Sequence, residues 1–311
     1  MIANSEPEKN WYENVPFVRR PSRQKPLVSI GVTTYNMQDK IGETIDSLVN
    51  QRGVDPREFE VVFVDDSSKD DTVGVLDWNM SRLGNARVVV NNQNKGAYAS
   101  KNRALEESEA PLLMIIDGDD LYCENTVAET LKFMGKNPGI KYSYSKHMRI
   151  DEDSNITVFR PSYDFSRESL LHMNYVVAVE SFYRDIFNEI GGFDDVHVED
   201  YDFVLRASEV LRDNQFGLNP MFLYKYRDTN GSKSDEVSVS RTSGCKVIEG
   251  SLSRLEGISK DVFSVGRRGP AGHTYYVHSR EAADASFEEE RERNYALDVS
   301  RARPKYSRAR A

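Results

Sequence analysis

Short apolar runs that alternate with amphipathic stretches are the feature that most limits what this chain can fold into. Extended runs are expected at residues 27–34, 60–64, 87–90, 112–116 and 140–145. The intervening segments have helical patterning; in residues 39–51, for example, Ile41, Ile45, Leu48 and Val49 fall on one helical face. Strands that alternate with helices indicate βαβ units. We therefore predict an α/β fold with a mostly parallel sheet flanked by helices.

The remaining chain is less regular. We expect helices at residues 181–190, 199–213 and 244–258, and a polar loop at residues 228–243. Residues 1–25 read as an N-terminal arm with several prolines, and residues 233–311 read as a helical C-terminal extension. Its basic tail is predicted to make a weak contact with an anionic surface or acceptor, or to be a disordered solubilising end.

Composition limits the compartment and the partners. No apolar run approaches the ~18 residues that cross a bilayer, and the acidic, aromatic N-terminus does not resemble a secretory signal. The two cysteines, Cys123 and Cys245, form no disulfide framework or metal-ligand pattern. A cytoplasmic location is therefore expected. The net charge of −9 argues against nucleic acid as the main partner.

Polar residues follow three of the predicted strands, at the point where each strand ends. These clusters are Thr33-Thr34-Tyr35-Asn36, Asp65-Asp66-Ser67-Ser68 and Asp117-Gly118-Asp119-Asp120. In an open parallel sheet, ligands bind beyond the carboxyl ends of the strands, so these clusters should meet at one rim.

Such a rim would hold several carboxylates, which repel one another unless a cation joins them. Carboxylate oxygens suit Mg²⁺ or Mn²⁺, and these ions usually bind through one or two carboxylates and substrate phosphates. The alternative is that acids after strands only cap helices or form turns, and we expect this role for Asp70 and Asp71. For Asp119 we favour the metal site.

Other chemistry has little support in the sequence. There is no P-loop and no dinucleotide-binding glycine fingerprint. The five histidines lack motif context and are expected to be ordinary surface or core residues.

Five segments, taken in order, resemble the family-2 glycosyltransferases of the GT-A fold: VSIGVTTYN (28–36), VVFVDDSSKDDT (61–72), NKGAYASKNRALE (94–106), LLMIIDGDDL (112–121) and VEDYDFVLR (198–206). The resemblance covers about residues 26–232. It implies a Rossmann-like nucleotide-binding half at residues 26–120 and an acceptor half at residues 121–232. It also implies a nucleotide-sugar donor and a divalent metal, Mn²⁺ or Mg²⁺.

The resemblance implies specific roles at the rim. The nucleotide would be bound by the strand-end residues and by the segment that carries Lys95, Gly96 and Lys101, with Asp66 accepting a hydrogen bond from the base, as is typical of uracil. The full nucleotide set is Thr33, Thr34, Tyr35, Asn36, Asp65, Asp66, Lys95, Gly96, Lys101, Asp117 and Gly118. Asp117-Gly118-Asp119 resembles the DxD motif, with Asp119, Asp120 and Asp117 as metal ligands.

Glu199-Asp200 resembles the family's second acidic pair, in which the Asp is the base that deprotonates the acceptor hydroxyl. A base on the face opposite the leaving group implies direct, inverting displacement. The segment 224–234 resembles a flexible stretch that closes over the donor, but Thr229 stands where many relatives have a metal-site His. His197 or His273 would be candidates to replace it.

The main alternative is a degenerate sugar-nucleotide-binding module that acts as a scaffold or regulator. A receiver domain and a haloacid-dehalogenase phosphatase also use acids after strands, but their lengths or motif positions differ from those of this chain. The acceptor could be a glycan, a lipid-linked intermediate, a protein side chain or a modified nucleic-acid base.

Overall fold

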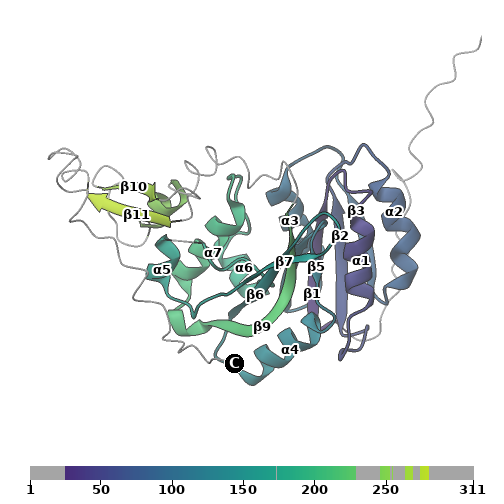
Figure 1. Ribbon diagram of the computed structural model, residues 1–311, viewed down its shortest axis with the longest axis horizontal. Helices are drawn as coiled ribbons and strands as arrows, with labels where there is room; N and C mark the ends of the chain where they lie inside the picture. Colours follow the sequence, from purple (N-terminus) through teal and green to yellow (C-terminus); the bar gives the residue numbers. More distant parts are fainter. Residues whose placement is uncertain are drawn as a thin grey trace, which may run out of the picture.

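The structure is a computed structural model, and it describes residues 25–172, 174–228, 246–252 and 254, and the backbone of residues 263–268 and 274–279. The expectations for the N-terminal arm, Thr229, His273 and the basic tail lie outside these residues. One nine-stranded sheet runs through the domain, with helices packed on both of its faces (Figure 1).

The first half of the sheet is parallel. Its strands lie in the order β3 (Ala86–Val90), β2 (Phe59–Asp65), β1 (Val28–Thr34) and β4 (Leu112–Asp117). The connections carry α1 (Ile41–Val49), α2 (Thr72–Asn79), a 3₁₀ turn at Met80–Arg82 and α3 (Ala97–Glu106). Thr34 pairs with Asp65 and Thr33 with Asp117, so the three polar clusters do meet at one rim.

The second half is mixed. β8 (Ser181–Tyr183) joins the two halves, because it pairs antiparallel with both β4 and β6 (Tyr142–Ile150). β6 is parallel to β9 (Phe216–Arg227) and antiparallel to β7 (Ile156–Arg160), and β5 (Leu121–Tyr122) is antiparallel to β9. The accompanying helices are α4 (Thr126–Lys136), α5 (Arg167–His172), α6 (Arg184–Ile190) and α7 (Glu199–Val210), with a 3₁₀ turn at Asp213–Gln215.

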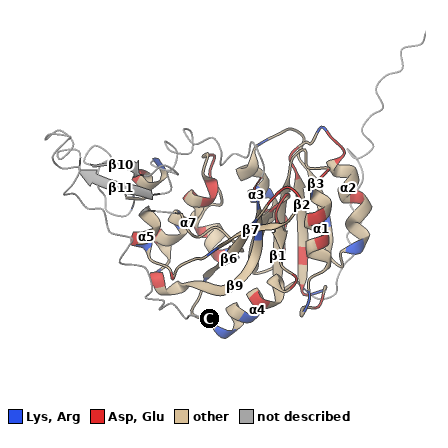
Figure 2. Ribbon diagram, in the orientation of Figure 1, with Lys and Arg blue, Asp and Glu red and all other residues tan. Residues whose placement is uncertain are grey.

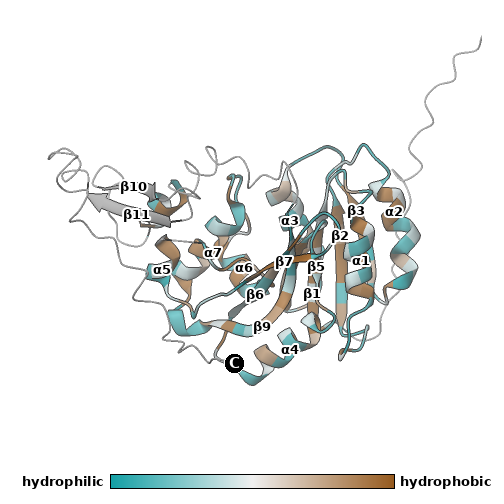
Figure 3. Cartoon of the chain, in the orientation of Figure 1, coloured by the Kyte–Doolittle hydropathy of each residue, from teal (hydrophilic) through white to brown (hydrophobic). Residues whose placement is uncertain are grey.

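Strand alternation builds a separate apolar core on each face of the sheet. Val28, Ile30 and Val32 of β1 pack into the core that also buries the apolar sides of α1, α2 and α4. The opposite core contains Leu105 of α3, Tyr142 of β6 and the buried side of α7. The hydrophobic colour accordingly lies mainly on the central strands (Figure 3). The α/β, mostly parallel fold predicted from the sequence is confirmed.

Two predictions were only partly right. The helix expected at residues 181–190 begins only at Arg184, because Ser181–Tyr183 fills the gap between β4 and β6 as a strand. In the extension expected to be helical, the described residues 246–252 and 254 are helical, within the helix expected at 244–258, but an antiparallel pair follows, β10 (Phe263–Arg268) and β11 (Thr274–Ser279). The aromatic and β-branched residues of these two strands favour extended backbone over helix.

None of the helices in the part of the chain that the structure describes has the length and apolar character to cross a bilayer. Acidic and basic residues occur together on α4, and neither sign covers this helix (Figure 2).

Candidate active site at the carboxyl ends of the strands

A cavity of about 480 Å³ opens beside the end of β4. Its walls come from α3, β4, β6, β9 and the start of α7, so it lies where the two halves of the sheet meet. Asp117, Glu180 and Asp200 line it, whereas Tyr35 and Asp66 do not. The predicted nucleotide rim and the cavity are therefore neighbouring sites that share Asp117 and Lys101.

The acids that follow β2 are held by hydrogen bonds within the nucleotide half. Asp65 accepts hydrogen bonds from the Thr34 hydroxyl, at 3.1 Å, and from the backbone and side chain of Ser68. Asp66 Oδ1 accepts from Asn91 Nδ2 at 2.7 Å and from the Lys95 backbone at 2.9 Å, and Oδ2 accepts from Gly96 N at 2.8 Å. A carboxylate has about four acceptor positions, so one remains for a base.

Glycines allow two close approaches at this rim. Gly96 has a φ of 89°, which a side chain would disfavour, and this backbone turns the 94–96 segment toward Asp66. A Cβ on Gly118 would lie 2.8 Å from the Thr33 carbonyl oxygen, so only glycine lets the turn after β4 lie against β1. Asn36 anchors the neighbouring loop, since its side-chain oxygen accepts from Lys69 N. Tyr35 is exposed beside it.

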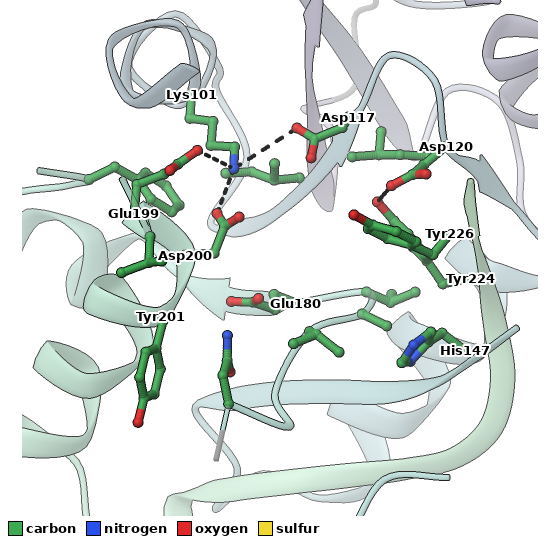
Figure 4. A pocket seen from close by; sticks show the side chains of 18 of the residues that line it. Lys101, Asp117, Asp120, His147, Glu180, Glu199, Asp200, Tyr201, Tyr224 and Tyr226 are labelled. Carbon is green, nitrogen blue, oxygen red and sulfur yellow. Dashed lines mark hydrogen bonds and ion pairs between the residues drawn. The ribbon is translucent and has the colours of Figure 1, made fainter. Parts of the chain in front are cut away.

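Lys101 is the centre of the acid cluster. Its side chain is only 2% exposed, and its Nζ lies 2.6 Å from Asp200 Oδ1, 3.3 Å from Glu199 Oε1 and 3.9 Å from Asp117 Oδ1 (Figure 4). The carboxylates raise the pKa of Lys101 well above its ordinary value, against the opposing effect of burial. An ammonium has three donors, and three carboxylates surround this one. Lys101 is thus held among carboxylates, and its predicted part in nucleotide binding stays a prediction.

The carboxylate of Asp200 is accessible to solvent and is more basic than an ordinary carboxylate. It lies in the first turn of α7, and 46% of its side-chain surface is exposed. Desolvation raises the pKa of Asp200 to about 6, with Glu199 and Asp117 adding to the rise and Lys101 opposing it. Its carboxylate accepts a hydrogen bond from Lys101 across the interface between the halves. It is therefore ionised at neutral pH, yet a stronger base than an ordinary carboxylate.

Adjacent acids in the DxD segment have different surroundings. Burial and the charge of Asp117 raise the pKa of Asp119 to about 6. Asp120 is buried, and its two oxygens accept from Tyr224 Oη and Arg227 N, each at 2.7 Å. Asp120 is only 2% exposed and each of its oxygens already accepts a bond from β9, so we expect Asp119 to be the better placed of the two for a cation, and the metal role of Asp120 stays a prediction.

No group of three or more His, Cys, Asp or Glu side chains is arranged as a metal site in the described part of the chain. Asp117 and Asp119 nevertheless fit a hard cation held by two carboxylates and phosphate oxygens. A cation would also relieve the repulsion that raises the pKa of Asp119.

Sequence reasoning missed several residues of the cavity. Glu180 lies between the acid cluster and His147 (Figure 4). Burial and the charge of Asp200 raise the pKa of Glu180 to about 8, and Tyr142 Oη donates a hydrogen bond to it. The sequence feature that could have identified Glu180 is its position as the single acid within the apolar run YVVAVESFY (175–183). His147, expected to be an ordinary residue, also lines the cavity, as does His197.

The domain that contains the cavity is similar to known glycosyltransferases. The model of glycosyl transferase family 2 matches residues 29–182. Chondroitin synthase of Escherichia coli is 26% identical over 245 residues, which are 78% of this chain and 35% of that protein. The chain thus spans about a third of the length of this relative.

Two solved structures share the fold. S. aureus TarS 1–349 in complex with UDP-GlcNAc aligns with a TM-score of 0.60 and 19% identity, over 76% of this chain and 68% of that one. The mannosyltransferase PcManGT of Pyrobaculum calidifontis, in complex with GDP-Man and Mn²⁺, aligns with a TM-score of 0.56 and 16% identity, over 76% and 66%. The fold is of the GT-A type, and the chain belongs to the family-2 glycosyltransferases through the domain that contains residues 29–182.

Proposed function

We propose that this protein transfers a sugar from a UDP-sugar to an acceptor hydroxyl, with inversion at the anomeric carbon and with Asp200 as the base. The observation that carries the proposal is the position of Asp200. Its accessible carboxylate faces the same cavity as Asp117 and is held by the buried Lys101. A donor at the DxD segment and a base in one cavity are what a single displacement requires.

The nucleotide would occupy the rim formed by β1 and β2. Tyr35 is exposed there to stack on a base, and Asp66 retains an acceptor position for a base N–H. UDP-GlcNAc in the TarS complex supports a uridine nucleotide, although GDP-Man in the archaeal enzyme shows that this fold also binds guanine.

Asp117 and Asp119 would hold the divalent cation, which neutralises charge on the departing diphosphate. Mn²⁺ in the archaeal complex supports this assignment. Asp200 would take the proton of the acceptor hydroxyl during attack. Lys101 would keep Asp200 ionised and fix its direction through their 2.6 Å contact. A positioned base of this kind accelerates a reaction by ~10²–10⁴-fold.

The cytoplasmic location also stays a prediction.

The test is nucleotide release. The protein is incubated with a panel of UDP-, GDP-, CDP- and TDP-sugars in Mn²⁺, and free nucleoside diphosphate is measured. We expect slow hydrolysis of one UDP-sugar and tighter calorimetric binding of UDP than of the other diphosphates. Tighter binding of GDP would overturn the uridine assignment. Binding without any release would favour the degenerate, scaffold-like alternative.

A further inference from the structure

The wall of the cavity opposite the acid cluster is basic and aromatic. His147 pairs with Arg160 across β6 and β7, and with Tyr224 across β6 and β9. Arg149 stands two residues from His147, and its partner on β9 is Tyr226. Directly paired residues and residues two apart share one face of a sheet. The five side chains therefore form one patch, and all of them line the cavity.

The charge of this patch is only partly balanced. Arg149 forms an ion pair with Asp228 and lies over the Tyr226 ring, 5.4 Å from its centroid. Arg160 forms no ion pair with any residue that the structure describes. Burial, with help from both arginines, lowers the pKa of His147 to about 4, so its ring is neutral at pH 7. The wall thus carries two guanidinium charges and one nearby carboxylate.

Three buried polar atoms of the cavity lining are unpaired within the described part of the chain. His147 Nδ1, Arg149 Nε and Asn174 Oδ1 are buried and form no hydrogen bond within the described residues. A buried polar group without a partner is unfavourable, because it has lost its hydrogen bonds to water. Such groups are rare in native proteins, and three of them around one cavity indicate a place where a ligand supplies the missing bonds.

We propose that this wall is an anion subsite, which binds a phosphate or carboxylate carried by the acceptor. The inference rests on the proposed function for its assignment to the acceptor. The wall faces Asp200 and Glu180 across the cavity, whereas the residues assigned to the nucleotide, other than Asp117 and Lys101, lie outside the cavity. Arginine forks suit both kinds of anion, because each offers two oxygens to paired N–H groups.

The test uses free anions as probes. Protein labelled with ¹⁵N-histidine is saturated with UDP and diamagnetic Mg²⁺, so that the donor diphosphate site is filled. It is then titrated with inorganic phosphate, with glucuronate and with uncharged glucose. We expect a saturable shift of the His147 ring signals with at least one of the anions and none with glucose. The anion that binds more tightly identifies the acceptor group as a phosphate or a carboxylate.

A matched pair of variants tests the wall itself. Arg160 is exposed, so Arg160→Met should fold normally, and it should weaken anion binding at least tenfold while leaving UDP affinity unchanged. Arg57→Met removes the same charge from a surface site in the nucleotide half and should change neither. The proposal is overturned if neither anion shifts His147, if both variants lose anion binding equally, or if Arg160→Met weakens UDP as much as the anion. None of these readouts requires turnover, so failure of sugar transfer is a separate result.

Discussion

Two groups of acids, one after β2 and the other after β4 and at the start of α7, have opposite surroundings. At the end of β2, Asp65 and Asp66 accept hydrogen bonds from neighbouring hydroxyl, amide and backbone groups, and these bonds fix the loops. At the end of β4 and the start of α7, Asp119 and Asp200 have raised pKa values, because burial and like charges oppose their ionisation. One set of acids stabilises structure. The other set keeps unfavourable charge that a ligand, a cation or a proton can relieve.

The largest effect on sugar transfer is expected in the second group of acids, at Asp200. Asp200→Asn should lower transfer by ~10²-fold or more, about 3 kcal/mol of transition-state stabilisation, because the amide cannot accept the proton. UDP affinity should change little. The protein should still fold, because the Asn oxygen can accept a hydrogen bond from Lys101, but loss of the ion pair should lower its stability. The measurement is the transfer rate beside calorimetric UDP binding.

Asp185→Asn is the control for this variant, because Asp185 is an exposed acid in the first turn of the neighbouring helix α6. Transfer by Asp200→Asn within about threefold of the parent, a small change on the scale of general-base catalysis, would remove Asp200 from the role of base. Glu199 and Asp202 would then be the next candidates.

A second prediction compares the free energy of unfolding of variants at an acid after β2 and at an acid after β4. Asp66→Asn should lower the free energy of unfolding by ~1–3 kcal/mol. Both oxygens of Asp66 accept hydrogen bonds from N–H groups, and in the variant the NH₂ group of Asn would face one of these donors. Asp120→Asn should be close to neutral, since its oxygen can still accept from Arg227 N while its NH₂ donates to the Tyr224 hydroxyl. Urea unfolding at pH 7 measures both. An equal loss of unfolding free energy in the two variants would contradict the distinction between the two groups of acids.

The third prediction concerns the metal. Asp119→Ala should abolish the part of UDP affinity that depends on Mn²⁺, because a carboxylate ligand holds the cation against the diphosphate. Asp120→Asn should retain that dependence. Calorimetry with Mn²⁺ and with a chelator gives the comparison, and unchanged Mn²⁺-dependent affinity in Asp119→Ala would exclude Asp119 from the metal site.

The last prediction is a change in pH dependence at Glu180. Its folded pKa of about 8 lies above its ordinary value, so the native state holds a proton that the unfolded state releases between about pH 4.5 and pH 8. This group therefore lowers stability as the pH rises through that window, by up to ~1.4 kcal/mol per pH unit.

Glu180→Gln cannot titrate, and its stability relative to the parent should rise from pH 5 to pH 8. Urea unfolding at each pH measures this difference, and the exposed Glu189→Gln should show none. A constant difference between Glu180→Gln and the parent across the window would mean that Glu180 is ionised throughout.

The parallel half of the fold was predictable because local pattern decides it. Apolar runs buried on both faces and one-sided helices appear directly in the sequence, and the topology then brings Thr33, Asp65 and Asp117 to one rim. The start of α6 was mispredicted because Ser181–Tyr183 is a strand only through pairing with β4 and β6, which no local pattern reveals. The contacts of Lys101 were also missed, since they depend on side chains brought together by the packing of α7.

The link between Lys101 and Asp200 has a consequence for the order of assembly. These residues are 99 positions apart in the chain, and they belong to different halves of the sheet. Contacts at such separation form late, because loop closure is costly before the intervening segments are in place. A chain emerging during synthesis would complete the nucleotide rim by the end of β4, well before the base exists. The protein would thus become able to bind a nucleotide before it can use one, and reaction with a stray hydroxyl would be delayed until the acceptor half has docked.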